Sequence, residues 1–341
     1  MSVTILEISR ETGFSKSTVH RALSGAGRID PETRDKVMEY VKKHNYQPNL
    51  QARSLVGAKT FILGVVVPDL SSQAYARAIA GVEKVAQSKG YSILIFSSDN
   101  SHLKQLQLIN RIKQYGIEGF IISPAHLIEQ QEFIDGLKNA GIPYVGIHNC
   151  QSQDICLVSS GEEIGAFRAV EYLIKLGHRR IGHVTIEQPD PGIKHKFDGY
   201  MRALKTYGIA FDPALVVRKD KSYAFGSGYE TTRELLQISD PPSAIFALSD
   251  NIAVGVAKGI KSLGLKIPED VSLIGYDNKD FTQVMEPQLT TVKTHFDEIG
   301  EHAATLLIGK IENPDFELKK TVCTPELVIR GSCTELTLNN N

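Results

Sequence analysis

Apolar and polar residues follow one pattern before residue 60 and another after it. In the first part, apolar side chains recur every three or four positions in three short segments between residues 3 and 46, which is the spacing of one helix face. Ser15 precedes the second segment and Asp30-Pro31 opens the third, and these residue types favour helix N-termini. The pattern predicts an all-α head of three helices over residues 1–47, with the second helix running from Lys16 to Leu23.

After residue 60, short apolar runs of strand length alternate with amphipathic helical segments. The runs are 62–67, 91–96, 119–122, 144–147, 180–184, 215–218, 244–247 and 271–276. The helices between them close near Gly90, Gly116, Gly141, Gly177, Gly208 and Gly264. Alternation of strand and helix predicts parallel sheets covered by helices. Because the runs fall into two similar sets, the predicted fold class is an α-helical head followed by an α/β domain with two doubly wound parallel sheets.

Two short segments lie outside these units. Residues 48–58 combine helix formers with a closing glycine, but about two turns of helix are marginal in water. We therefore interpret this segment as a hinge helix that is ordered only when a partner holds it. Residues 332–341 form a tail that lacks the leucine heptads of a coiled coil, so a tetramer is not predicted.

Composition narrows the class of protein. Hydrophobic residues make up 42% of the 341 positions and charged residues 23%, which is near the average of globular proteins. The start of the chain has no apolar signal region, and the longest apolar stretches are only strand length. We expect neither secretion nor membrane insertion, and hence a cytoplasmic protein. The four cysteines, which form no C-x-x-C pair, are expected to be reduced thiols rather than metal ligands.

Charge is distributed unevenly along the chain. The net charge is −1, yet residues 1–60 contain ten Lys or Arg against six Asp or Glu. A basic module on a slightly acidic body is expected where only one part of a protein meets phosphates. In the second predicted helix Lys16, Ser17, His20 and Arg21 face outward, and such side chains can read base edges in a major groove. Taken alone, a basic helix face is more often simply solvated.

Several segments occur together in one order along the chain. They are Val3–Ile8, Gly13–Leu23, Pro31–Arg34, Tyr46–Asn49 and Ala52–Leu55, followed by Leu63–Val66, Gly177–Ile181, Gly275–Asn278 and Thr290–Val292. In this combination the chain closely resembles, over essentially its full length, the lactose-repressor and purine-repressor family.

The resemblance implies a homodimer that binds a near-palindromic DNA operator. Each head would read one half-site, and paired hinge helices would enter the minor groove with Leu55 as an apolar wedge. Arg21 matches the family's base-reading arginine, whereas His20 replaces its usual serine and leaves the half-site sequence open. The DNA-binding residues that the resemblance implies are Lys16, Ser17, Thr18, His20, Arg21, Asn49, Arg53 and Leu55.

Residues 59–331 resemble periplasmic sugar-binding proteins, which bind a ligand between two lobes. We expect one lobe over residues 59–158 and 293–323, and the other over 159–292 and 324–331. Ligands of such folds bind at the carboxyl ends of the strands. This rule, together with the family's aromatic and effector-holding positions, selects Asp69, Ser72, Tyr75, Ser123, His148, Lys196, Tyr223, Ser249, Asp250, Asp277 and Phe296. The implied effector is a sugar or a sugar phosphate, with no cofactor and no metal.

Four residues of the ligand-binding domain depart from the family. His148 stands where Asp is common, Lys196 where Arg usually holds the effector, and Gly161-Glu162 where Asp-Asn is frequent. Since Lys lacks the bidentate fork of Arg, the bound group can differ from the usual one. The identity of the effector, and whether it induces or corepresses, stays open.

The sequence argues against two other classes of protein. An α/β enzyme would need a phosphate-binding loop, a G-x-G-x-x-G turn or a nucleophile triad, and none is recognisable; the Gly226-Ser-Gly228 step lacks a third glycine. A sugar-binding protein without a DNA role predicts a signal peptide and no basic head. The sequence therefore favours a transcription repressor that is not an enzyme.

Overall fold

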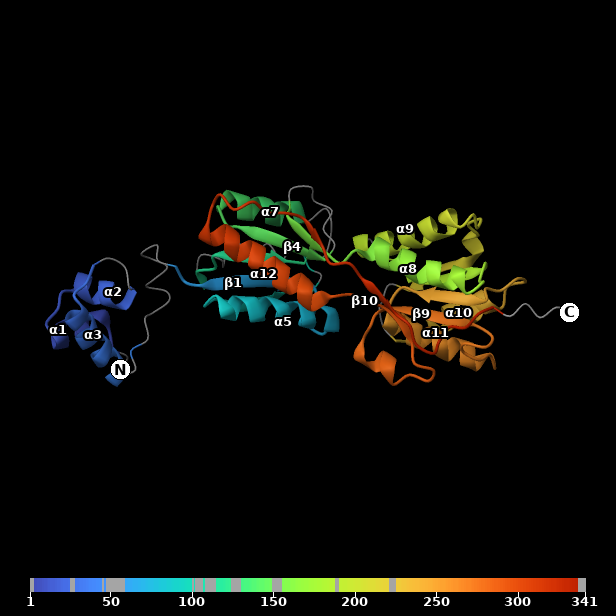
Figure 1. Ribbon diagram of the computed structural model, residues 1–341, viewed down its shortest axis with the longest axis horizontal. Coiled ribbons are helices and arrows are strands. Elements are labelled where there is room, and N and C mark those ends of the chain that lie inside the picture. Colours follow the sequence, from blue (N-terminus) through green and yellow to red (C-terminus); the bar gives the residue numbers. More distant parts are fainter. Residues whose placement is uncertain are drawn as a thin grey trace. The chain divides into compact units, whose positions relative to one another are not determined.

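The computed structural model describes residues 3–24, 28–44, 46, 59–99, 101, 107, 115–123, 130–148, 155–187, 190–220 and 225–336. It divides into two compact units, Met1–Thr60 and Phe61–Asn341, whose helices and strands are labelled in Figure 1. The predicted hinge residues Asn49, Arg53 and Leu55 lie outside the described residues, as does Tyr223.

The described residues of the first unit contain three helices, as the sequence predicted. They are α1 (Ile5–Thr12), α2 (Lys16–Ser24) and α3 (Pro31–Lys43). Ile8, Val19, Ala22 and Val37 form its buried core. The Ser15 hydroxyl accepts a hydrogen bond from Thr18 N at 3.2 Å, which confirms Ser15 as the cap of α2. Because each helix buries only one or two large side chains, none of the three would be stable alone.

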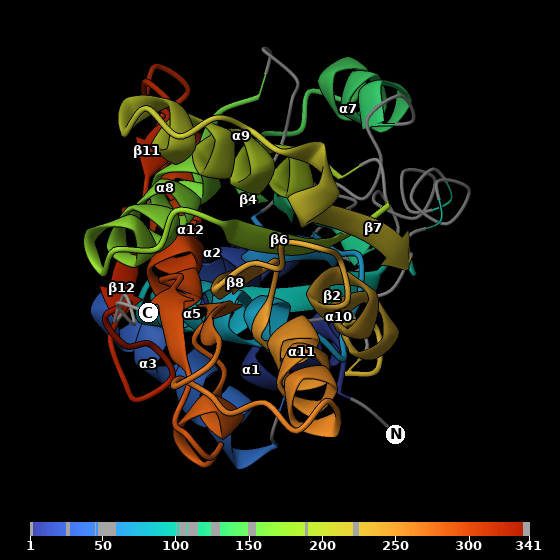
Figure 2. The ribbon, with the colours of Figure 1, turned by 90° about the vertical axis from the view of Figure 1, so that its right-hand side faces the viewer.

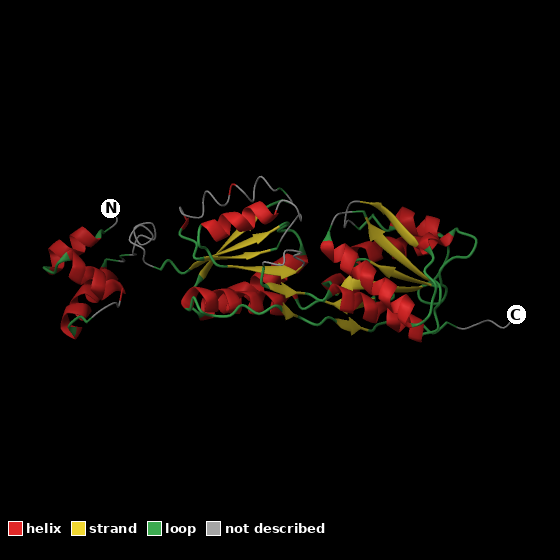
Figure 3. Ribbon diagram, turned by 90° about the horizontal axis from the view of Figure 1, so that it is seen from above, coloured by secondary structure: helices red, strands yellow, loops and turns green. Residues whose placement is uncertain are grey.

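The second unit begins with a lobe built on a six-stranded parallel sheet, which we call the N-lobe. Its strand order is β11 (Thr321–Val322), β5 (Leu157–Ser159), β4 (Tyr144–His148), β3 (Gly119–Ile122), β1 (Ile62–Val67) and β2 (Ser92–Ser97). Helices α5 (Gln73–Ser88) and α12 (Phe296–Glu312) cover one face, and α7 (Gln130–Asn139) covers the other (Figure 3). Along β1, Val65 and Val67 enter the α5/α12 core while Val66 enters the α7 core, so this strand is buried on both faces.

A second six-stranded sheet forms the other lobe, the C-lobe. Its order is β12 (Glu326–Val328), β10 (Thr290–Lys293), β9 (Ser272–Asp277), β8 (Ala244–Ala247), β6 (Ile181–Ile186) and β7 (Val216–Asp220). Figure 2 shows helices α8 (Glu162–Lys175) and α9 (Pro191–Thr206) on one side of the sheet, and α10 (Tyr229–Leu236) and α11 (Asp250–Ser262) on the other. Short 3₁₀ turns, η1 (Pro213–Leu215) and η2 (Asp280–Gln283), complete it.

The chain crosses between the lobes three times. The crossings join β5 to α8, β10 to α12, and β11 to β12. Among the described strands, β10 and β12 pair antiparallel and the other pairs are parallel. The domain is therefore two α/β lobes connected by three crossings of the chain, which leaves the carboxyl ends of both sheets at the junction.

The predicted strands are present, and three of them, β1, β3 and β8, have the predicted bounds. The six glycines expected to close helices all have positive φ, from 64° at Gly116 to 96° at Gly177. The sequence missed the crossing strands β5, β10, β11 and β12. They have only two to four residues and lack the apolar runs of central strands.

Candidate functional site

The junction of the lobes gathers residues with an unusual backbone. His148 ends β4 with φ 71°, Asp277 ends β9 with φ 106°, and Asn278 follows with φ 52°. Left-handed backbone at residues other than glycine costs about 1 to 3 kcal/mol and is concentrated at functional sites. Strain at the ends of two strands, one in each lobe, marks this junction as the candidate ligand site.

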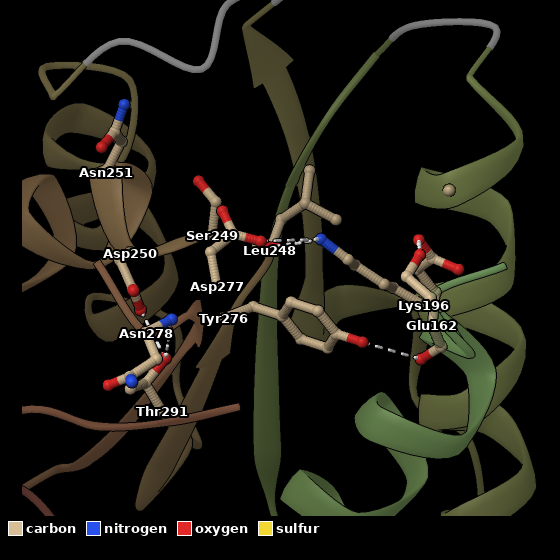
Figure 4. Close-up of polar contacts among 12 residues, drawn as sticks. Glu162, Lys196, Leu248, Ser249, Asp250, Asn251, Tyr276, Asp277, Asn278 and Thr291 are labelled. Carbon is tan, nitrogen blue, oxygen red and sulfur yellow. Dashed lines mark hydrogen bonds and ion pairs between the residues drawn. The ribbon is translucent and has the colours of Figure 1, made fainter. Parts of the chain in front are cut away.

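Lys196 and Asp277 occupy the C-lobe side of the junction (Figure 4). The buried Lys196 Nζ donates to the carbonyl oxygen of Leu248 at 3.1 Å and lies 3.9 Å from Asp277 Oδ1. It also lies 3.9 Å from the ring centre of Tyr276, a favourable cation–π distance. The Leu248 carbonyl, the Tyr276 ring and the Asp277 carboxylate therefore surround the Lys196 ammonium group, and the Asp277 carboxylate balances its charge.

Asp250 lies behind Asp277 and is fully buried. Its Oδ1 accepts from Thr291 Oγ1 at 2.6 Å, and its Oδ2 accepts from Lys279 N at 2.7 Å. Burial and the nearby Asp277 carboxylate raise the pKa of Asp250 to about 7. Because both oxygens already have partners, Asp250 shapes the loop after β9. The neighbouring Ser249 is also buried, and its hydroxyl caps α11 by accepting from Ile252 N at 3.4 Å.

Aromatic side chains line the N-lobe side. The His148 ring lies between those of Tyr75 and Phe296, with ring centres 6.2 and 5.7 Å away. Burial raises the pKa of the Tyr75 hydroxyl strongly, partly opposed by Ser123 and reinforced by carboxylates that include Asp190. The rings of Tyr75, His148 and Phe296 supply apolar faces to the junction.

Two predicted residues of the N-lobe lie nearer solvent. Asp69 follows β1 and is exposed, and its Oδ1 accepts from the backbone N–H and the hydroxyl of Ser71 at 2.8 and 2.7 Å. Ser72 is the N-cap residue of α5, but its side chain makes no capping bond. The N–H groups of the first turn of α5 are therefore not satisfied by their cap residue.

Glu162 joins this site although the sequence marked it only as a departure from the family. It is buried at the start of α8, where Ser160 donates to its carboxylate, and His148 Nδ1 lies 3.2 Å from Glu162 Oε1. A residue of β4 is thereby connected to one of α8 across the first crossing. The spacing of 14 residues carried no signal for this contact.

A small pocket, partly open to solvent, lies between the lobes. It is lined by Gln73, Ala74, Arg77, Asp277, Asn278, Lys279 and Phe296. Asp277 and Phe296 were predicted for the site. The others were missed: Lys279 lies only two residues beyond Asp277, but nothing in the sequence marks Gln73 or Arg77.

On the head, the predicted DNA-reading side chains gather on α2. Lys16, Ser17, His20 and Arg21 are exposed, and Thr18 is half-buried. Arg21 Nε donates to Ser17 O at 3.3 Å, and the side chain is exposed. An exposed polar face opposite the buried Val19 and Ala22 suits a helix that enters a groove.

Two further properties concern the part of the chain that the structure describes. No cluster of three or more metal-binding side chains occurs there. A separate search of the same residues finds no helix with the length and apolar character needed to cross a membrane.

The fold and its two sites define a DNA-binding regulator with a ligand-binding domain, and comparison with known proteins identifies the family. Residues 4–49 match the model of bacterial regulatory proteins of the lacI family, and residues 170–333 match the periplasmic binding protein-like domain. Catabolite control protein A of Priestia megaterium is 36% identical over 310 residues, covering 90% of this chain and 92% of the relative. The repressor CytR of Escherichia coli K12 is 30% identical, covering 98% and 97%. The chain belongs to the LacI family of transcription regulators.

Solved structures show the same architecture. The Lac repressor dimer bound to operator and an anti-inducer superposes with a TM-score of 0.87 at 22% identity, covering 98% of this chain and 100% of that chain. The regulator CelR in complex with cellobiose superposes with a TM-score of 0.73 at 25% identity, covering 97% and 99%. The chain is thus a DNA-binding transcription regulator with an effector-binding domain, and its relatives are regulators rather than enzymes.

Proposed function

We propose that this regulator is a repressor whose affinity for its operator is controlled by a sugar or a sugar phosphate bound between the lobes. The observation that carries the proposal is the junction itself, where Asp277, the partner of Lys196, lines the same pocket as Phe296 of the other lobe. Sugar hydroxyls both donate and accept hydrogen bonds, so paired ammonium and carboxylate groups suit them. Tyr75 and Phe296 supply the apolar faces against which a sugar ring packs.

The coupling we propose is mechanical. An effector that contacts both lobes favours one lobe arrangement over another by the difference of its affinities for the two. In a dimer this changes the spacing of the two hinge segments, and only one spacing lets both heads engage a near-palindromic operator. Coupling of this kind is typically about 1 to 3 kcal/mol. A homodimer is supported by the Lac repressor, whose structure is that of a dimer on its operator.

Several details of the proposal extend beyond the described residues. Asn49, Arg53 and Leu55 would form the hinge helix, with Leu55 inserted in the minor groove, and Tyr223 would join the effector site. The remaining assignments are those made from the sequence, with Asp250 acting through the loop after β9 and Ser249 through the start of α11. A DNA-binding role places the protein in the cytoplasm.

Binding to DNA tests the first half of the proposal. The full chain should select a near-palindromic fragment from genomic DNA, and its affinity should fall steeply with salt because each phosphate contact releases counterions. Deleting residues 1–57 should abolish this binding. A full chain that prefers no fragment at moderate ionic strength, with or without candidate metabolites, would contradict the proposal and favour a sugar-binding protein without a DNA role.

Thermal stability tests the second half. A ligand at about 100 times its dissociation constant adds about 2.7 kcal/mol of stability, so a thermal-shift screen should find the effector. The screen should include neutral sugars, sugar phosphates and purines. Stabilisation by purines alone would contradict the assignment of a sugar as the effector. Turnover of a bound sugar would instead favour an α/β enzyme.

A further inference from the structure

One carboxylate of the C-lobe bonds to two side chains of the N-lobe. Asp280, the first residue of η2, accepts from Arg77 NH2 at 2.5 Å through Oδ1 and from Gln73 Nε2 at 2.8 Å through Oδ2. Gln73 and Arg77 lie one turn apart on α5, so the two donors share one face of that helix. Both oxygens of one carboxylate are therefore used to connect the lobes.

The loop that carries Asp280 is held in place from a distant part of the chain. Arg330 donates from NH2 to Asn278 Oδ1 at 2.7 Å and from NH1 to Thr282 Oγ1 at 3.1 Å. These two contacts flank Asp280 on both sides. Because the loop is held, little conformational freedom is lost when Asp280 bonds to α5.

The contact lies at the edge of the pocket between the lobes. Gln73 and Arg77 line that pocket from the N-lobe, while Asp277 and Lys279, the latter next to Asp280, line it from the C-lobe. Closing the contact therefore brings together the two walls that a ligand must touch at once.

We infer that Asp280, Gln73 and Arg77 form a clasp that favours the lobe arrangement in which both lobes line the pocket. Exposed ion pairs shift an equilibrium by about twofold to fivefold at most. Asp280 and Arg77 are partly exposed, with 72% and 37% of their side-chain surfaces accessible, so the clasp adjusts the equilibrium rather than locking it. If the proposed function holds, the clasp raises the affinity for an effector that bridges the lobes by the same factor.

The lobe arrangement can be measured without DNA or effector. The full chain would carry two fluorophores on azide-bearing amino acids at positions 87 on α5 and 205 on α9, both of which are exposed. Labelled chains are diluted into unlabelled protein, so that energy transfer reports on lobes of one chain. The variant Asp280→Ala should increase the ratio of separated to joined lobes about twofold to fivefold.

Two further variants make the test specific. The double variant Arg77→Asp with Asp280→Arg restores opposite charges and should recover the wild-type distribution. The matched control is Glu301→Gln, which breaks the 2.7 Å ion pair of Lys84 with Glu301 between α5 and α12 inside the N-lobe. An Asp280→Ala distribution identical to wild type would overturn the inference, and so would an equal shift in the control. Neither result depends on whether the effector is a sugar.

Discussion

Lys196 Nζ and Asp277 Oδ1 lie 3.9 Å apart, and only 9% and 16% of their side-chain surfaces are accessible. Charges this far out of water are stable only when they balance one another. A ligand that enters the site must therefore either bridge the two groups or compete for one of them. An effector that binds this pair can therefore change the arrangement of the lobes.

Replacing the acidic member of that pair should uncouple sensing from DNA binding. Asp277→Ala removes the acceptor and leaves Lys196 with Leu248 O and the Tyr276 ring. We expect the effector concentration for half response to rise at least tenfold, since a lost charged hydrogen bond costs about 1.5 to 3 kcal/mol. Operator affinity without effector should be unchanged. A fluorescence-anisotropy titration of operator DNA measures both, and a response at ordinary effector concentrations would show that the pocket is misplaced.

Arg21 on α2 should carry sequence discrimination. Arg21→Ala should weaken cognate operator binding by about 1 to 3 kcal/mol, the cost of one bidentate base contact, while binding to unrelated DNA weakens much less. Lys36→Ala removes the same charge from the exposed surface of α3 and serves as the control. Competition binding with cognate and scrambled duplexes gives the ratio. If the two variants lower that ratio equally, Arg21 contributes only charge.

Leu55 lies outside the described residues, so its role as a wedge remains a prediction from the sequence. Leu55→Ala should weaken operator binding more than tenfold, because unstacking a base step is then no longer offset by apolar contact; this step is worth a few kcal/mol. Ligand stabilisation in a thermal-shift assay should persist. Unchanged operator affinity would count against insertion in the minor groove.

The elements could be predicted from the sequence wherever local chemistry decides them. Apolar runs of strand length placed β1, β3 and β8, and Ser15 marked the start of α2 because a cap acts within one turn. Residues of the site could be predicted where they follow strand ends, as at Asp277, or where the family resemblance marked them, as at Phe296. Contacts that close over long separations were not predictable: Asp280 meets Arg77 across 203 positions, and no periodicity encodes such a meeting. The same reason explains why the role of Arg330 beside Asn278 was missed.

Acid should destabilise the C-lobe through His183. This ring is fully buried, its Nδ1 donates to Phe246 O at 3.0 Å, and burial lowers its pKa from 6.5 to about 4. Between pH 6.5 and 4, His183 is protonated in the unfolded chain but stays neutral in the folded protein. The free energy of unfolding therefore falls by about 3 kcal/mol as the pH drops through this range. Asp250 acts oppositely: its raised pKa means that the folded state gains a proton as the pH falls from about 7.

The variant His183→Asn separates these contributions. Its amide can still donate to Phe246 O but does not titrate, whereas Asp250 is unaffected. The difference in unfolding free energy between variant and wild type, from urea titrations, should shift in favour of the variant by about 3 kcal/mol from pH 6.5 to 4. A difference that stays constant over this range would mean that His183 keeps its ordinary pKa in the folded protein.

Two glycines allow α5 and α12 to pack in close contact. A Cβ on Gly81 would lie 2.0 Å from Asp297 O, and one on Gly300 would lie 2.0 Å from Ala78 O, so the backbones of both helices would have to separate. Although alanine favours helix by about 1 kcal/mol, overpacking costs about 1 to 3 kcal/mol or more, and here it strikes rigid backbone. Gly81→Ala should therefore lower the free energy of unfolding by about 2 kcal/mol, measured in urea. Gly226 provides the control, because a Cβ added there would meet no atom within 4 Å: Gly226→Ala should stay within about 0.5 kcal/mol of wild type. Equal stability of the two variants would mean that α5 and α12 can move apart at no cost, and that the close packing does not hold the N-lobe together.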